Sequence, residues 1–204
     1  MSLNNKTELA IIDAARKVFI SKGYDGATME KIASEAKVNK ALLHYYYRSK
    51  DKLFKIVLTE AIGIIREKLF LIIKSEDNLE VIIKELIDVY VETLINHPYL
   101  PNFIVNEISS NPEKVIKILL GDKLSTFTVL RMVVIIRNKL FEVNKEVINP
   151  FDFILNVISL NVFPFLIRPF IINLFEMKDE QFKSYMNNRK SDLSSFILKN
   201  CEAV

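Results

Sequence analysis

The sequence predicts an all-α protein, and three features of the chain carry that prediction. Apolar residues recur with a period near 3.6 along most of the chain, which is the spacing of one helix face. The 204 residues include 4 glycines and 6 prolines, and we find no internal repeat or low-complexity linker. The residues are 50% hydrophobic, which is enough to bury a sizeable core in a small domain followed by a larger one.

The first expected helix runs from about Thr7 to Ser21. Its inward face is an apolar stripe at helical spacing, made of Ile11, Ile12, Ala15, Val18 and Phe19. Gly23 follows shortly after this stripe, and glycine commonly ends a helix. We therefore expect the first helix to end near Gly23.

Two short helices joined by a tight turn are expected next. Thr28 can cap the first of them, whose inward positions are Met29, Ile32, Ala33 and Ala36. Asn39 can cap the second, which runs from Lys40 to about Tyr47. A helix of about two turns is marginal in water, so packing must hold it, and Leu43 and Tyr47 are its natural inward pair. This is the outline of a helix-turn-helix motif that reads DNA.

The outward side chains of the second helix have the chemistry to contact base edges. Lys40 can donate to O6 and N7 of guanine or to a phosphate, and Leu42 can contact a thymine methyl group. His44 can donate or accept at a base edge. For each residue taken singly, the alternative is an ordinary surface side chain.

Other side chains near these helices are better matched to the DNA backbone. Tyr45 and Tyr46 can donate to phosphate oxygens, while one of the three consecutive tyrosines is expected to be core. Lys50 lies in the first turn of the following helix, and it adds a cation to a helix terminus that already favours anions. Thr28 lies at the N-terminus of the preceding helix, which favours anions in the same way.

The chain after this motif reads as further helices. Ser49 can cap a long helix that continues to about Lys74 and joins the motif to the rest, so we expect domains of residues 1–52 and 53–204. Four breakers separate the later helices: His97-Pro98, Asn111-Pro112, Gly121-Asp122 and Asn149-Pro150. The expected ranges are Leu79–Asn96, Asn102–Ser109, Pro112–Leu120, Ser125–Glu142, Pro150–Phe175 and Asp179–Cys201. Pro164 and Pro169 each lack a backbone donor and should kink or break the helix that contains them.

Charge is distributed unevenly along the chain. Residues 1–55 contain 11 Lys and Arg against 6 Asp and Glu, a balance of +5, whereas residues 56–204 contain 17 against 19, a balance of −2. The basic excess therefore coincides with the helix-turn-helix motif, as expected for contact with phosphates.

The cysteine content and the apolar segments of the chain indicate its cellular location. Cys201 is the only cysteine, which excludes an intramolecular disulfide and suits a reducing interior, and the first residues do not read as a signal peptide. We therefore expect a cytoplasmic protein. The apolar stretch 153–175 is interrupted by Pro164, Pro169 and Arg168, so a buried helix at a subunit contact is a better interpretation than a membrane span.

The sequence offers no recognisable catalytic or metal-binding pattern. It has two histidines, His44 and His97, and lacks paired cysteines, the HExxH motif and a glycine-rich phosphate loop. We expect no enzyme activity, no metal and no cofactor.

Several ordered elements of the N-terminal region resemble the tetracycline-repressor (TetR) family of transcriptional regulators. These elements are AARKVF at residues 14–19, KGYDGATMEKIA at 22–33 and VNKALLHYYYRSKDKLF at 38–54. Two departures from the family pattern are visible. Lys37 stands where glycine is frequent in the turn, and Ala41 and Leu42 stand where glycine and threonine are common.

The resemblance implies a dimeric DNA-binding regulator, usually a repressor, whose helical body binds an effector and a second subunit. It places DNA contacts at Lys40, Leu42, His44, Tyr45, Tyr46 and Lys50, and we include Thr28 and Ala41 among the expected DNA contacts. For a mostly apolar effector we consider Tyr90, Asn106, Arg131 and Asn156 as polar anchors. For a homodimer, in which the last two long helices pair with their copies and the operator is an inverted repeat, we consider Phe163, Phe182, Arg189, Leu193 and Phe196. The alternatives are core helices of a monomer, and a helical small-molecule-binding or membrane-peripheral protein without specific DNA binding.

Overall fold

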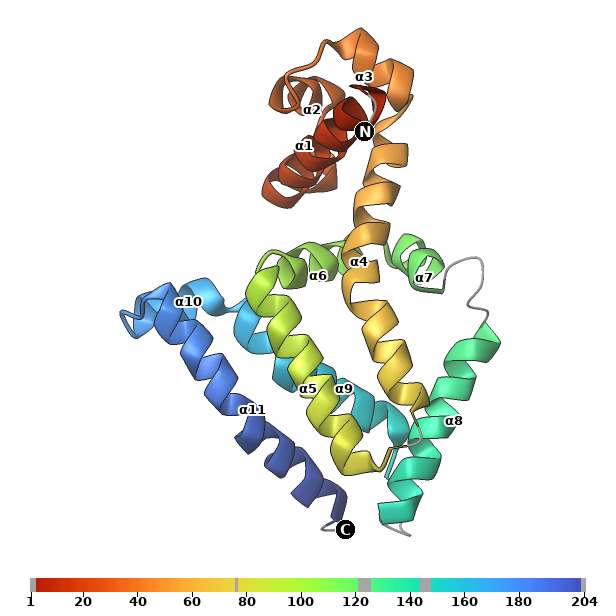
Figure 1. Cartoon of the computed structure of the whole chain (residues 1–204), viewed down its shortest axis with the longest axis vertical. Coiled ribbons are helices and arrows are strands. Elements are labelled where there is room, and N and C mark those ends of the chain that lie inside the picture. The colour runs from red at the N-terminus through yellow and green to blue at the C-terminus, as the bar shows by residue number, and fades with distance from the viewer. Residues whose placement is uncertain (1–2, 76, 121–125, 144–147, 203–204) are drawn as a thin grey trace. The chain divides into compact units, whose positions relative to one another are not determined.

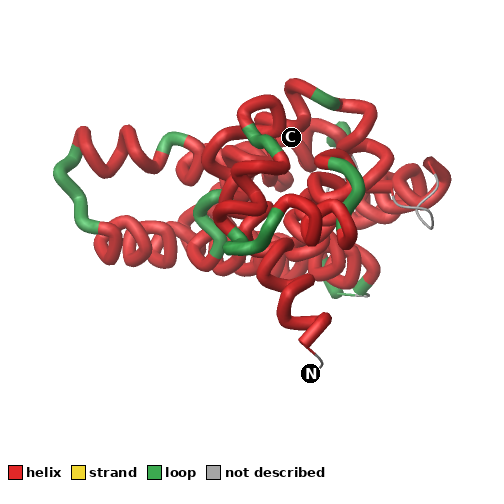
Figure 2. Tube along the Cα trace, turned by 90° about the horizontal axis from the view of Figure 1, so that it is seen from above, coloured by secondary structure: helices red, strands yellow, loops and turns green. Residues whose placement is uncertain are grey.

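A computed structural model of the chain describes residues 3–75, 77–120, 126–143 and 148–202. These residues form helices and loops, and no strand lies among them (Figures 1 and 2). The first four helices are α1 (Leu3–Gly26), α2 (Met29–Glu35), α3 (Lys40–Tyr46) and α4 (Lys50–Lys74). The others are α5 (Leu79–Asn96), α6 (Leu100–Ser110), α7 (Pro112–Leu120), α8 (Thr126–Val143), α9 (Pro150–Leu166), α10 (Arg168–Leu174) and α11 (Asp179–Glu202).

The predicted all-α fold is confirmed, and most helices agree closely with the expected ranges. The expected Leu79–Asn96 and Pro112–Leu120 are α5 and α7 without change. The breaker Gly121-Asp122 and the expected helix start at Ser125 lie outside the described residues. In α1, the backbone at Gly23 has a φ of 65° and a ψ of 179°, so the helix is kinked there. This left-handed φ is one that glycine adopts readily, which agrees with the expected end of the first helix.

The chain divides into two compact units. Unit 1 comprises Met1–Gly63 and Phe103–Leu119, and unit 2 comprises Ile64–Asn102 and Leu120–Val204. The division expected from the sequence differs in two respects, because the first unit extends into α4 and also includes a segment of α6 and α7. The contacts described below around Tyr24 give the physical reason for the second difference.

Unit 1 is organised around aromatic and aliphatic side chains that have no exposed surface. Ile11 and Phe19 on α1, Ile32 on α2 and Leu43 on α3 are all 0% exposed. Phe54 on α4 is also fully buried, and its ring lies 5.0 Å from that of Phe19 in an edge arrangement. The apolar stripes read from the sequence therefore converge on one core, which holds the short helices α2 and α3 in place.

Unit 2 is built on α5, which packs against α11 and α9 (Figure 1). Nine residues of α5 are buried, including Ile83, Ile87 and Val91. On the neighbouring helices, the rings of Phe165 and Phe182 meet edge to face at 5.6 Å. The centre of this unit is therefore an apolar layer between α5 and its two neighbours.

The expected range Pro150–Phe175 contains two helices with a 55° bend between them, so the interruption expected within this range is present. Pro164 lies inside α9 and does not end it. The carbonyl that its missing N–H would have bonded belongs to Leu160, and this oxygen accepts a hydrogen bond from Nη2 of Arg189 at 3.4 Å. The break comes instead at Ile167, and Pro169 then sits in the first turn of α10, where a backbone donor is not needed.

Among the described residues, no single helix is long and apolar enough to span a membrane. The bent pair α9 and α10 meets the criteria of length and composition only when its two helices are taken together.

Candidate nucleic-acid interface

Side-chain caps fix the starts of both α2 and α3. Oγ1 of Thr28 accepts a hydrogen bond from the backbone N–H of Lys31 at 3.2 Å, and Oδ1 of Asn39 accepts one from Leu42 at 2.7 Å. Lys37 adopts a φ of 56° between the helices, so a lysine occupies a backbone conformation that favours glycine. Both predicted caps are thus confirmed.

The helix α3 is anchored on one side, as its apolar spacing predicted. Leu43 is 0% exposed and Tyr47, which follows the last residue of α3, is 3% exposed. The Tyr47 hydroxyl donates a hydrogen bond to Oε1 of Glu8 on α1 at 3.0 Å. Burial and this carboxylate raise the pKa of Tyr47 above its ordinary value of 10.0, so the phenol remains a donor. This anchor decides which face of α3 turns outward.

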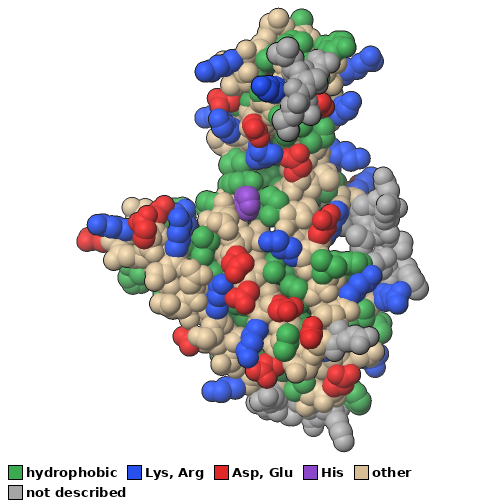
Figure 3. Space-filling view, viewed as in Figure 1, with side chains coloured by type: hydrophobic (Ala, Val, Ile, Leu, Met, Phe, Trp, Pro, Cys, Tyr) green, Lys and Arg blue, Asp and Glu red, His purple; other side chains and the backbone are tan. Residues whose placement is uncertain are grey.

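The opposite side of α3 presents polar and aromatic side chains to solvent. Lys40, Ala41, His44 and Tyr45 are exposed, and Tyr45 is 78% exposed. The rings of Tyr45 and Tyr46 lie 5.4 Å apart at 86°, so each supports the orientation of the other. Figure 3 shows Lys and Arg side chains around the surface of unit 1 that faces the viewer. A capped helix that exposes aromatic side chains and a lysine has the chemistry to contact a nucleic acid.

Lys50, expected to bind a phosphate, already has partners within unit 1. Its ammonium donates to the carbonyl oxygen of Tyr24 at 3.0 Å and lies 4.1 Å from the centre of the Tyr24 ring. The side chain is half-buried. A phosphate could use its remaining N–H donors, since an ammonium has three.

Tyr24 is the centre of a cluster that the sequence analysis did not identify. Its hydroxyl donates to Oδ1 of Asp51 at 2.7 Å, and its ring meets that of Phe54 at 4.8 Å. Lys114 of α7 reaches the same group, with its ammonium 4.7 Å from the Tyr24 ring, 4.6 Å from the Phe54 ring and 3.2 Å from Oδ1 of Asp51. The Phe54 ring also meets that of Phe103 on α6 at 6.1 Å. Segment 103–119 therefore belongs to the core of the unit that contains the helix-turn-helix.

The charges of this cluster perturb one another. The hydrogen bonds from Tyr24 and Lys114 lower the pKa of Asp51 from its ordinary 3.8, and burial together with the Asp51 carboxylate raises the pKa of Tyr24 to about 12. Glu107 on α6 is 3% exposed and accepts a hydrogen bond from Asn111 at 3.3 Å. Burial raises the pKa of this carboxyl.

The four residues considered as effector anchors do not form one site. Tyr90 on α5 is buried, and burial raises the pKa of its phenol to about 12. Asn106 on α6 and Arg131 on α8 are exposed. Asn156 on α9 lines a groove of about 410 Å³ between α9 and α11, which contains none of the other three. Their different helices and exposures explain why residue type alone could not group them correctly.

The residues considered for a subunit interface have two different environments. Phe182 and Leu193 are 1% and 3% exposed because α11 packs against α5, so their burial needs no second chain. Phe163 and Phe196 are 57% and 56% exposed. Arg189 is half-buried beside α9, where it donates to the Leu160 carbonyl.

The described residues contain no group of three or more His, Cys, Asp or Glu side chains that could hold a metal ion. Cys201 on α11 is 3% exposed, so its side chain is buried.

Residues 11–57 match the family model described as "Bacterial regulatory proteins, tetR family". Over 54 residues the chain is 43% identical to the HTH-type transcriptional repressor NicS of Pseudomonas putida, covering 26% of each protein. Over 45 residues it is 40% identical to IcaR of Staphylococcus epidermidis, the HTH-type negative transcriptional regulator of the biofilm operon icaADBC, covering 22% of this chain and 24% of that protein. These alignments therefore span about a quarter of the relatives' length.

Solved structures extend the likeness to the whole fold. HlyIIR, a hemolysin II transcriptional regulator, is 23% identical with a TM-score of 0.62, over 96% of this chain and 97% of that one. A TetR-like transcriptional regulator from Rhodococcus sp. RHA1 is 18% identical with a TM-score of 0.61, over 95% and 94% of the two chains. At these identities the likeness establishes the arrangement of helices.

Proposed function

Since the helix-turn-helix of this chain is that of the tetR family of bacterial regulatory proteins, we propose that the protein is a sequence-specific DNA-binding transcriptional regulator. The observation that carries the proposal is the two-sided α3, with Leu43 and Tyr47 buried and an exposed polar and aromatic face opposite them. We further propose that the protein represses transcription, which is the role that the names of the relatives NicS and IcaR give for those proteins. The protein acts by binding, without turnover, in the cytoplasm where bacterial DNA lies.

Within this proposal, the outward residues of α3 divide the contacts with DNA between bases and backbone. Lys40, Leu42 and His44 read base edges in the major groove, with Ala41 beside them. The remaining contacts position the protein on the phosphates and carry no sequence information. Tyr45, Tyr46, Lys50 and the α2 terminus at Thr28 make these contacts.

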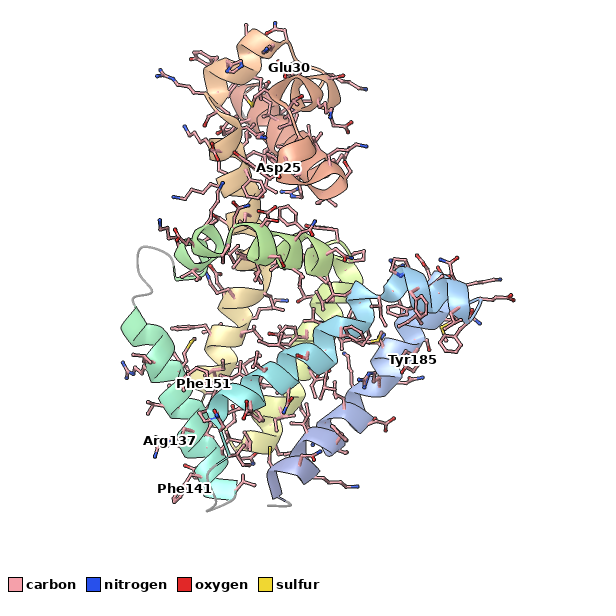
Figure 4. All side chains as sticks on the ribbon, turned by 180° about the vertical axis from the view of Figure 1, so that it is seen from behind. Asp25, Glu30, Arg137, Phe141, Phe151 and Tyr185 are labelled. Carbon is pink, nitrogen blue, oxygen red and sulfur yellow. The ribbon has the colours of Figure 1, made fainter. Side chains whose placement is uncertain are left out.

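A homodimer would present two α3 helices to an inverted-repeat operator. Support comes from an apolar face on unit 2, where Phe151, Leu155 and Ile158 recur at i, i+4 and i+7 on α9 and are 57%, 60% and 38% exposed. Figure 4 labels Phe151 at the start of this helix. Phe196 lies on the wall of the adjacent α9–α11 groove. Apolar side chains exposed in this number on neighbouring helices are typical of a surface that a partner covers.

A small, mostly apolar effector completes the proposal, with the apolar interior of unit 2 as its supporting feature. The contacts of Lys114, Phe103 and Tyr24 provide a physical path by which a displacement of segment 103–119 would reach the helix-turn-helix.

Selection of bound sequences from a random duplex library tests the function. We expect a single enriched motif that is an inverted repeat, with half-sites about one helical turn apart. A bound pool without an enriched motif would contradict sequence-specific recognition. Binding of a lipid vesicle or small apolar molecule without any DNA affinity would favour the helical binding protein considered as the alternative.

A further inference from the structure

The helix α3, which is proposed to read base edges, contains one lysine, and a carboxylate of the same unit forms an ion pair with it. α3 has the sequence KALLHYY, in which Lys40 is the only lysine or arginine. The Lys40 ammonium forms an ion pair and hydrogen bond with Oε1 of Glu30. Glu30 lies in the first turn of α2 and is labelled in Figure 4. Their side chains are 56% and 60% exposed. The pair is therefore accessible to a DNA duplex that approaches α3.

The local structure favours the charged form of Glu30. Its carboxylate lies at the N-terminal end of α2, where negative charge is stabilised, next to the Thr28 cap. The hydrogen bond from Lys40 lowers the pKa of Glu30 to about 2, so the pair is ionised at neutral pH. A fixed negative charge therefore sits beside the surface proposed to meet DNA.

This charge acts differently on the two kinds of DNA contact. A phosphate that approaches Lys40 also approaches the Glu30 carboxylate, and the like charges repel. A guanine edge offers neutral acceptors, O6 and N7, and the Lys40 ammonium retains N–H donors after one has bonded to Glu30. Holding the ammonium in one place also favours a contact with defined geometry over a mobile one with the backbone.

We propose that Glu30 is a specificity-determining residue that restrains Lys40 and thereby weakens binding to non-specific DNA. The proposal rests on the DNA-reading function of α3 proposed above. It assigns to an acidic residue of α2 a role in sequence discrimination that does not require Glu30 itself to contact DNA.

The chain contains a matched control pair in the same unit. Lys17 on α1 and Glu35 on α2 form an ion pair at 3.1 Å, with side chains 72% and 42% exposed. Glu30→Gln and Glu35→Gln each remove one negative charge from α2 and raise the net charge by one. Only Glu30→Gln releases the cation of α3.

The experiment measures equilibrium binding of the full chain to two duplexes over a series of salt concentrations. One duplex carries the selected motif, and the other has the same bases in shuffled order. We expect Glu30→Gln to raise affinity for the shuffled duplex about threefold to fivefold, the size of an exposed ion-pair effect, and to steepen its salt slope by up to about one unit. Affinity for the selected duplex should change less, so the preference falls.

A double-mutant cycle shows whether Glu30 acts through Lys40. In a Lys40→Ala background, Glu30→Gln should no longer change the preference between the two duplexes. Thermal unfolding of the variants should match the wild type, because an exposed ion pair contributes little stability.

Three results would overturn the inference. Equal effects of Glu30→Gln and Glu35→Gln would show a general charge effect, and persistence of the Glu30→Gln effect without Lys40 would show that the pair is not responsible. Loss of affinity for the selected duplex alone would make Glu30 a direct base contact. By contrast, a wild-type chain that binds both duplexes equally contradicts the proposed function rather than this role of Glu30.

Discussion

Lys114→Met tests whether segment 103–119 stabilises the helix-turn-helix unit. The substitution keeps an unbranched aliphatic stem and removes the ammonium. In the wild type, the ammonium lies 4.7 Å and 4.6 Å from the centres of the Tyr24 and Phe54 rings. The Lys114 side chain is 30% exposed, so each cation–π contact contributes about 0.5–1 kcal/mol, while the ion pair with the 69% exposed Asp51 adds little. The variant should lose about 1–2 kcal/mol of unfolding free energy in unit 1.

Hydrogen exchange followed by mass spectrometry locates this loss in the chain. A decrease of about 1–2 kcal/mol corresponds to exchange that is roughly 5- to 30-fold faster in protected peptides. We expect this increase in peptides that cover the end of α1 and the start of α4, although both are distant from residue 114 in sequence. Lys117→Met is the matched control, because Lys117 lies on the same helix and is exposed.

Equal exchange in Lys114→Met and Lys117→Met would refute the reasoning. Segment 103–119 would then not stabilise the helix-turn-helix, and the path proposed for effector coupling would lose its physical basis.

Three further predictions concern the DNA-reading face, the subunit contact and a buried carboxyl. Alanine at Leu42 or His44 should cost about 1–3 kcal/mol on the selected duplex and relax the sequence choice in a repeated selection; an equal loss on a shuffled duplex would make them backbone contacts. Phe196→Glu should shift sedimentation toward the monomer, with Leu71→Glu, at a 71% exposed position on α4, as the control; an unchanged dimer affinity would exclude this face. Glu107→Gln should stabilise the protein at neutral pH, since burial raises the folded pKa of Glu107 above its ordinary 4.5 and the charged form is disfavoured. The gain should fade as the pH falls through the raised folded pKa toward 4.5 and be absent below 4.5, where the carboxyl is protonated in both states. Urea titrations at a series of pH values that show a constant difference would contradict this cause.

Local signals in the sequence were sufficient for most of the fold. Asn39 was identified as a cap because its amide precedes a short helix, and its hydrogen bond to the N–H of Leu42 has the expected geometry. Leu43 and Tyr47 were identified as the inward pair because residues four apart share one helix face. Both inferences concern residues within about one helical turn of each other. At that separation, the spacing in the sequence determines which side chains share a helix face.

Contacts between distant segments could not be predicted in this way. Lys114 meets Asp51 across 63 residues of sequence, and neither residue lies in a pattern that indicates the other. Lys50 was assigned to phosphate from its place at a helix start, but its contact with the Tyr24 carbonyl depends on how α1 packs beside α4. The effector anchors were chosen by residue type alone, and packing distributed them among different environments.

The end of the ninth helix shows a similar limit. A proline removes one backbone donor wherever it occurs, which predicted interruptions at both Pro164 and Pro169. Whether a helix continues depends on whether another donor bonds to the carbonyl oxygen that has lost its backbone N–H partner. Arg189, 29 residues from Leu160, donates to that carbonyl, and α9 continues through Pro164.

The most direct test of the central claim compares binding of the full chain to the selected and the shuffled duplex at several salt concentrations. If the outward face of α3 reads bases, the selected duplex should bind at least about 10³-fold more tightly at physiological salt. The logarithm of each binding constant should fall linearly with the logarithm of salt concentration. The saturated selected duplex should hold two chains for each inverted repeat. Equal affinity for the two duplexes at every salt concentration would contradict the claim.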